Sequence, residues 1–232
     1  MHTMRRMSAA IVAALWIFGV FQLSDLAAAG GAGAAAMSPA QGLAQLVAGN
    51  QRFQRGASGH PNQDAKRRAA LAGGQSPFAV IVSCSDSRVP PEVIFDQGLG
   101  DLFVVRVAGN TVTRAGLESI DYAVDHLGSS LIVVLGHDSC GAVKGAVAQC
   151  VGKPAARLPE IFANICPAVA QARKAGGDNL ESSAIDFNVA GQVRMLERSP
   201  LFQKRIENGS LKIVGGRYYL KSGKVEIFKS GD

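Results

Sequence analysis

The hydrophobic positions of this chain follow two alternating patterns. Short, continuous apolar runs rich in β-branched residues are typical of strands buried on both faces of a parallel sheet. Longer stretches place apolar residues at the three- and four-residue spacing of helices. The predicted strands are residues 78–83, 102–107, 131–135 and 211–214, with a terminal hairpin at 218–228, and the predicted helices are residues 39–55, 115–127, 141–150, 158–174 and 185–198.

This order of strands and helices predicts an α/β fold. We expect a mainly parallel central sheet of about four strands, flanked by helices and completed by a C-terminal edge strand. Ser38 as N-cap and Pro39 at the first helical position favour an N-terminal helical arm before the first strand. The chain is long enough for one sizeable core, so we expect residues 37–232 to form a single domain.

The first 36 residues have the layout of an export signal. Arg5 and Arg6 precede an uncharged apolar stretch, residues 7–24, and small residues follow it. Alanines at 27–29 and at 34–36 both offer cleavage sites, so we assign residues 1–36 to a signal peptide and expect a periplasmic or secreted protein. The alternative is a retained anchor, because the apolar stretch approaches the length that spans a bilayer.

Composition and charge exclude several classes of protein. The chain has 24 Lys and Arg against 18 Asp and Glu, but these basic residues are scattered, so nucleic-acid binding is not indicated. The 27 glycines follow no triplet period, which excludes collagen. Nothing after the signal is long and apolar enough to span a membrane, so we expect no stable membrane insertion once the signal is removed.

Candidate metal ligands follow two of the predicted strands. Cys84 comes directly after the first strand, and His137 and Cys140 come after the third. In an open parallel sheet, ligands bind outside the carboxyl ends of the strands, so the three side chains can converge. Two thiolates and an imidazole suit zinc and leave a fourth position for water or for Asp86, as in a catalytic site. Taken singly, each cysteine also fits a buried apolar position and the histidine a solvated loop.

These motifs resemble those of the β-class carbonic anhydrases. The resemblance rests on Cys84-Ser-Asp-Ser-Arg88 with His137-x-x-Cys140 and extends over essentially the whole mature chain. It implies one zinc ion per subunit held by Cys84, His137 and Cys140, with Asp86 and Arg88 as the catalytic dyad that controls the fourth position. The implied activity is the reversible hydration of carbon dioxide to bicarbonate and a proton by zinc-bound hydroxide, which zinc makes available near neutral pH.

The resemblance also implies a substrate pocket and an oligomer. Gln75, Phe103 and Tyr122 match pocket residues of the plant-like branch, where such residues come partly from a neighbouring subunit, so a homodimer or a dimer of dimers is implied. The backbone amide of Gly141 is a further candidate donor to bicarbonate. For Phe103, core packing is the alternative when the residue is considered by itself.

One departure from the family bears on regulation. Ile81 replaces the tryptophan found three residues before the cysteine in the branch that binds inhibitory bicarbonate, so we expect Asp86 to be paired with Arg88 and away from the metal at neutral pH. For proton transfer, His60 and His126 are the candidate shuttles.

The residues also allow other functions, and they allow two states for the remaining cysteines. Carbon disulfide and carbonyl sulfide hydrolases resemble the same family, and a zinc-binding protein without turnover is a further alternative. Cys150 and Cys166 lie outside the motif, and an exported protein allows a disulfide between them, although Cys166 fits a buried thiol equally well.

Overall fold

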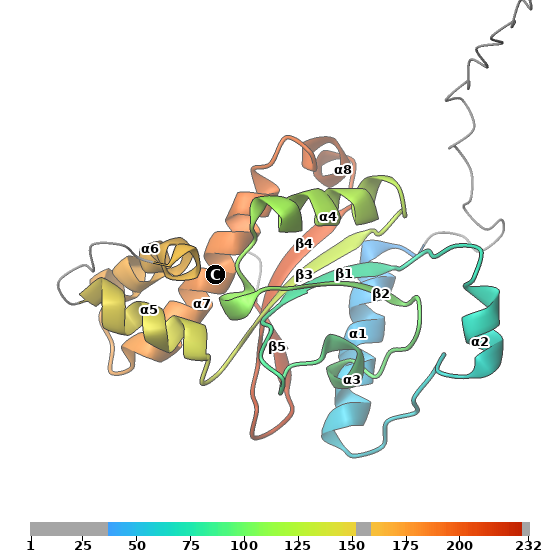
Figure 1. Cartoon of the computed structure of the whole chain (residues 1–232), viewed down its shortest axis with the longest axis horizontal. Coiled ribbons are helices and arrows are strands. Elements are labelled where there is room, and N and C mark those ends of the chain that lie inside the picture. Colours follow the sequence, from blue (N-terminus) through green and yellow to red (C-terminus); the bar gives the residue numbers. More distant parts are fainter. Residues whose placement is uncertain (1–36, 152–158, 229–232) are drawn as a thin grey trace, which may run out of the picture.

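The computed structural model describes residues 37–151 and 159–228. The predicted signal peptide, residues 1–36, therefore lies outside the described residues. Of the helices in the described part, none is both long and apolar enough to cross a membrane. The described chain folds around one five-stranded sheet with the strand order β2-β1-β3-β4-β5 (Figure 1).

The sheet confirms the predicted arrangement of strands. Four strands pair in parallel: β1 (Ala79–Ser83), β2 (Leu102–Arg106), β3 (Leu131–His137) and β4 (Lys212–Tyr218). β5 (Val225–Ile227) pairs antiparallel with β4 at the edge. The prediction ended the fourth strand too early, at Val214, because Gly215 and Gly216 interrupt the apolar run. A Cβ on Gly215 would lie 2.7 Å from a methyl group of Val189, so the strand needs glycine where α7 crosses it.

Helices cover both faces of the sheet (Figure 1). Their bounds are α1 (Pro39–Gln54), α2 (Ala65–Ala70), α3 (Pro91–Ile94), α4 (Arg114–Asp125), α5 (Gly141–Val151), α6 (Glu160–Ala175), α7 (Leu180–Glu197) and α8 (Gln203–Glu207), with a short 3-10 turn η1 (Ala108–Asn110). The short helices α2, α3 and α8 were not predicted. α7 begins earlier than predicted because the side chain of Asn179 accepts a hydrogen bond from the Ser182 N–H, at 2.9 Å, and caps the helix.

Successive residues along the strands point to opposite faces of the sheet and pack into two separate hydrophobic cores. Ile81 of β1 packs with Leu46 of α1 on one face, whereas Val82 packs with Ile120 of α4 and Val189 of α7 on the other. The predicted N-terminal helical arm is α1, and it packs on the sheet. α5 and α6 lie beside α7 and form a third apolar cluster that contains Cys84 and Cys140.

A disulfide links two of the helices in this third cluster. Cys150, near the end of α5, and Cys166, in α6, are joined with their Cα atoms 5.8 Å apart. Cys84 and Cys140 are the free cysteines, and both are buried. The structure therefore favours the disulfide over a buried Cys166 thiol.

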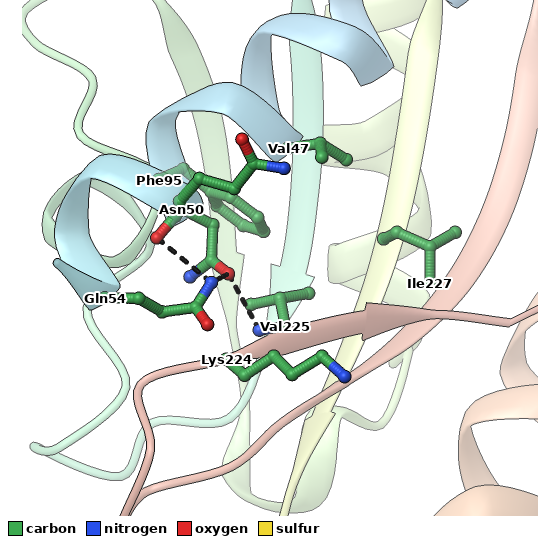
Figure 2. A pocket seen from close by; sticks show the side chains of 8 residues that line it. Val47, Asn50, Gln54, Phe95, Lys224, Val225 and Ile227 are labelled. Carbon is green, nitrogen blue, oxygen red and sulfur yellow. Dashed lines mark hydrogen bonds between the residues drawn. The ribbon is translucent and has the colours of Figure 1, made fainter.

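The buried side chain of Asn50 ties α1 to the β4–β5 hairpin (Figure 2). Its Nδ2 donates to the carbonyl oxygens of Ile94 and Gly223, and its Oδ1 accepts from the Val225 N–H at 2.8 Å. These bonds border a cavity of about 310 Å³ between α1 and β5. None of the predicted site residues lines this cavity.

Asp96 holds the loop after α1 against the core, and its replacement tests how much this loop stabilises the fold. The buried carboxylate accepts from the Gly59 N–H at 3.0 Å, from the His60 N–H at 2.9 Å and from Arg52. Burial alone would raise the pKa of Asp96, but these hydrogen bonds outweigh it and lower the pKa. We expect Asp96→Asn to lower the free energy of unfolding by about 2 kcal/mol at pH 7, measured by urea denaturation of the zinc-loaded protein.

The pH dependence of this loss follows from the lowered pKa. A carboxyl with a lower pKa in the folded state stabilises the protein at pH values above its unfolded pKa, about 3.9, and this contribution disappears as the pH falls through the folded pKa. The difference between wild type and Asp96→Asn should therefore shrink below about pH 4. Asp125→Asn, at an exposed pair with Arg205, is the control and should cost less than about 0.5 kcal/mol. Equal stability of Asp96→Asn and wild type at pH 7 would contradict the prediction.

Candidate metal centre

The three predicted ligands lie together at the carboxyl ends of β1 and β3. Cys84 follows the last residue of β1, His137 is the last residue of β3, and Cys140 directly precedes α5. The two strands are neighbours in parallel register, so both end at the same edge of the sheet. The ligand atoms of all three side chains lie within 4.8 Å of one another, and all three residues are buried.

The donor set fits a zinc ion. His137 Nδ1 lies 2.9 Å from the Asp138 carbonyl oxygen, so Nδ1 carries the proton and Nε2 is left with a free lone pair. Nε2 is buried and has no hydrogen-bond partner among the described residues, which is costly unless the atom binds a metal. Two cysteine sulfurs and one imidazole nitrogen are ligands that zinc prefers in tetrahedral sites. The residues Cys84, His137 and Cys140 would therefore hold zinc.

The surroundings of Cys84 favour the thiolate. Backbone N–H groups of Gly109 and Asp86 donate to its Sγ at 3.2 Å and 3.4 Å. The hydrogen bond from the Cys140 thiol lowers the pKa of Cys84 most, and it outweighs the burial that would raise this pKa. The pKa of Cys140 is raised in turn, first by its hydrogen bond to Cys84 and then by burial. Because the ionised Cys84 disfavours a second thiolate beside it, a cation between the two sulfurs is needed to keep both ionised.

Asp86 lies beside the cluster and is paired with Arg88, as predicted. Arg88 Nε donates to Oδ1 at 2.9 Å and Nη2 donates to Oδ2 at 2.7 Å, while Oδ2 lies 3.9 Å from His137 Nε2. This forked pair lowers the pKa of Asp86 well below its ordinary value, so the carboxyl is ionised at neutral pH and accepts hydrogen bonds without donating any.

Arg106, which had no predicted role, supports the loop that carries Cys84 and Asp86. Its Nε donates to the Cys84 carbonyl oxygen at 3.0 Å and its Nη2 to the Asp86 carbonyl oxygen at 2.6 Å. Arg106 is the last residue of β2 and pairs with Ser83 in the β1–β2 register, which places its side chain beside the loop after β1. The contacts of Arg106 could not be predicted because they depend on the pairing of β2 with β1, and the local sequence does not reveal which strands are neighbours.

The predicted pocket residues do not reach the cluster within one chain. Gln75 is exposed and precedes β1, and Phe103 pairs with Val80 near the amino end of β2, whereas Cys84 follows the carboxyl end of β1. The rings of Phe103 and Tyr122 are 6.4 Å apart, and Tyr122 is 47% exposed. Gly141, by contrast, begins α5 directly after Cys140 and is exposed.

Neither of the two candidate shuttle histidines belongs to the ligand cluster of the described chain. The ring of His126 lies tilted against that of Tyr122, one helical turn earlier in sequence, with the ring centroids 5.3 Å apart, and so belongs to the Phe103–Tyr122 group. His60 is exposed in the loop that Asp96 holds. Neither position assigns a proton shuttle within one subunit.

Comparisons with known proteins agree with this geometry. A sequence profile described as carbonic anhydrase matches residues 79–225. The chain is 44% identical to carbonic anhydrase 2 of Mycobacterium tuberculosis strain H37Rv over 82% of this chain and 93% of that protein. It is 34% identical to a carbonic anhydrase of Pseudomonas aeruginosa, with 79% and 86% covered.

Solved structures give the same result for the fold. The β-carbonic anhydrase CcaA matches with a TM-score of 0.63 and 28% identity over 81% of this chain and 95% of that chain. One of two β-carbonic anhydrases from Sordaria macrospora, which are described as tetrameric, matches with a TM-score of 0.60 and 26% identity over 71% and 87%. The profile, the curated relatives and the solved folds agree with the Cys84–His137–Cys140 cluster, and the chain therefore belongs to the β-class carbonic anhydrase family.

Proposed function

We propose that this protein catalyses the reversible hydration of carbon dioxide to bicarbonate and a proton, with one zinc ion per subunit held by Cys84, His137 and Cys140. The observation that carries the proposal is the combination of this buried ligand cluster with a carboxylate that is held beside it by Arg88. A site that only stored zinc would not need the ionised Asp86 at its edge.

The residues around the cluster have separable tasks. The residues Cys84, His137 and Cys140 would hold a zinc ion, which would supply Lewis acidity and so make hydroxide available near neutral pH. Asp86 Oδ2, which cannot donate, would accept a hydrogen bond from the O–H of the attacking hydroxide and so leave a lone pair of that oxygen directed at the carbon of carbon dioxide. Arg88 fixes that carboxylate through two parallel hydrogen bonds and keeps it from the metal. The Gly141 N–H, at the start of α5, is the donor we assign to a bicarbonate oxygen.

A second copy of the chain would complete the substrate pocket. Gln75, Phe103 and Tyr122 lie at the opposite end of the sheet from the ligands of their own chain, and β2 is an edge strand with half-buried apolar residues. We assign these three residues to the pocket of a neighbouring subunit, where an apolar wall would admit carbon dioxide. A homodimer or a dimer of dimers satisfies this arrangement, and the tetrameric relatives from Sordaria macrospora support it.

We also propose that residues 1–36 are an export signal and that the mature protein is periplasmic or secreted. The layout of the sequence, with two arginines before an apolar stretch and small residues, supports this assignment. The Cys150–Cys166 disulfide supports it independently, because disulfides persist in oxidising compartments and are rare in the cytosol.

Stopped-flow measurement of carbon dioxide hydration by the purified protein tests the proposed activity. We expect activity at neutral pH in the zinc-loaded protein, loss on chelation and recovery when zinc is restored. Asp86→Asn should retain zinc and lose rate. Zinc-loaded protein without hydration at any pH would overturn the proposal, and carbonyl sulfide and carbon disulfide would be the next substrates to assay. If Asp86→Asn changed neither zinc content nor any turnover, the site would be a zinc-binding site without catalysis.

A further inference from the structure

A buried amide on α7 contacts the backbone that donates to Cys84. Asn188 Nδ2 donates to the Gly109 carbonyl oxygen at 2.8 Å, and the Gly109 N–H donates to Cys84 Sγ at 3.2 Å. The two hydrogen bonds engage the peptide groups on either side of one Cα atom. We propose that Asn188 is a positioning residue for the Cys84 thiolate, acting through Gly109; the inference rests on the zinc site of the proposed function.

Gly109 has no side chain to restrict its backbone torsion angles, so other contacts must fix the direction of its N–H. Its φ of 69° lies in the left-handed region, where glycine is at home and other residues are strained. A Cβ at this position would also meet Ile165 Cδ1 of α6 at 2.7 Å, so the close packing of α6 requires glycine. The same absence of a side chain removes any steric preference that would keep the Gly109 N–H directed at the sulfur. The Asn110 N–H closes the turn around Gly109 by donating to the Val107 carbonyl oxygen at 2.9 Å, and the hydrogen bond from Asn188 adds a direct constraint on the Gly109 carbonyl group.

Packing alone does not account for an asparagine at position 188. The residue is 2% exposed, and its neighbours on α7, Ile185 and Val189, belong to the apolar cores. Its Oδ1 has no hydrogen-bond partner among the described residues, so the bond to Gly109 is the contact its amide makes there. Burying an amide with an unpaired oxygen costs free energy that leucine, which has the same branching and number of side-chain heavy atoms, would not cost. The hydrogen bond to Gly109 is therefore what asparagine provides at this position and an apolar residue would not.

The N–H donated to sulfur has a direct effect on a metal ligand. A hydrogen bond to a thiolate withdraws charge from it and fixes the direction of its lone pairs, and partners outside the ligand set change metal affinity by about 10–100-fold. Without Asn188 the Gly109 N–H would drift from Cys84, leaving the Asp86 N–H at 3.4 Å as the backbone donor to the sulfur. Cys84 would then donate more charge to the metal and hold it in a less defined geometry.

The test uses cobalt as a spectroscopic probe in the full-length protein. We expect Asn188→Leu to shift the sulfur-to-cobalt charge-transfer band of the Co²⁺-loaded protein to longer wavelength. It should also weaken zinc binding by about 10-fold in competition with a chromophoric chelator. The matched control is Gln192→Leu, one turn further along α7, where Gln192 Oε1 accepts from the Val112 N–H at 3.0 Å and does not contact Gly109. This control should keep the wild-type band and affinity even if it loses stability.

Each outcome decides for or against the proposal. A wild-type band and wild-type affinity in Asn188→Leu would show that Asn188 only packs, and equal shifts in Gln192→Leu would show a general loosening of α7; either result overturns the proposal. If Asn188→Leu does not fold, Asn188→Ala, which adds no bulk, takes its place with the same expected shift. Because the band requires bound metal but no turnover, wild-type protein that binds cobalt and fails to hydrate carbon dioxide would refute the proposed activity and leave this inference open to the same test.

Discussion

Replacement of Arg88 by methionine is expected to lower carbon dioxide hydration at neutral pH by about 100-fold while zinc remains bound. Methionine keeps an unbranched apolar stem in place of the aliphatic part of arginine but removes both N–H groups that hold the Asp86 carboxylate. The freed Oδ2, already 3.9 Å from His137 Nε2, is then close enough to take the fourth ligand position, since zinc binds carboxylate oxygen readily. Stopped-flow rates and the zinc content of the same sample measure the effect.

Two further variants separate this explanation from simple loss of charge. Arg88→Lys keeps the positive charge without the fork and should recover only part of the rate. Arg88→Met combined with Asp86→Asn should be more active than Arg88→Met alone, because the amide is a poorer zinc ligand than the carboxylate. Arg114→Met, at the exposed pair with Glu118, is the control for removing an arginine and should match wild type. Wild-type rates in Arg88→Met would refute a gating role for the pair.

The order of elements in the fold could be predicted because buried parallel strands are continuous apolar runs. β1, β2 and β3 all fall within predicted ranges or extend them by two residues, and His137 itself proved to be the last residue of β3. The error in β4 has one cause, since Gly215 gives no apolar signal and is needed only because Val189 of α7 approaches it. The helices α2, α3 and α8 span four to six residues, too few for a helical period to be detected.

The ligand cluster could be predicted for a different reason. Cys84 directly follows β1, His137 ends β3 and Cys140 comes three residues later, so their meeting requires only that β1 and β3 end at one edge. Arg106, Gly109 and Asn188 act on this cluster through backbone groups, and which carbonyl or N–H they contact depends on strand order and on where α7 crosses the sheet. Such contacts have no fixed spacing in the sequence. They could be identified only from the assembled fold.

The Cys150–Cys166 disulfide stabilises the same region from its outer side. α5 starts one residue after the ligand Cys140, and α6 presses Ile165, the neighbour of Cys166, against Gly109. The bond therefore joins the two helices that enclose the cluster, across a sequence separation of 16 residues. In the chain-entropy account, closing a loop of this length lowers the conformational entropy of the unfolded chain and thereby stabilises the folded state by about 3 kcal/mol. In the oxidising compartment that we propose for this protein, Cys84 and Cys140 must be kept from pairing with each other, which a bound cation would do.

Replacing both Cys150 and Cys166 by alanine is expected to lower the free energy of unfolding by about 3 kcal/mol, because the unfolded chain regains the freedom of the closed loop. Chemical denaturation of the zinc-loaded protein at one fixed concentration measures this loss. A phosphine reductant is used because a dithiol reductant would compete with the protein for zinc. Reduction should bring the free energy of unfolding of wild type to that of the double variant and leave the double variant unchanged. Alkylation of the denatured wild type without reduction should modify only Cys84 and Cys140. Labelling of all four cysteines, or a double variant as stable as wild type, would show that this bond does not form or does not stabilise the helices around the metal centre.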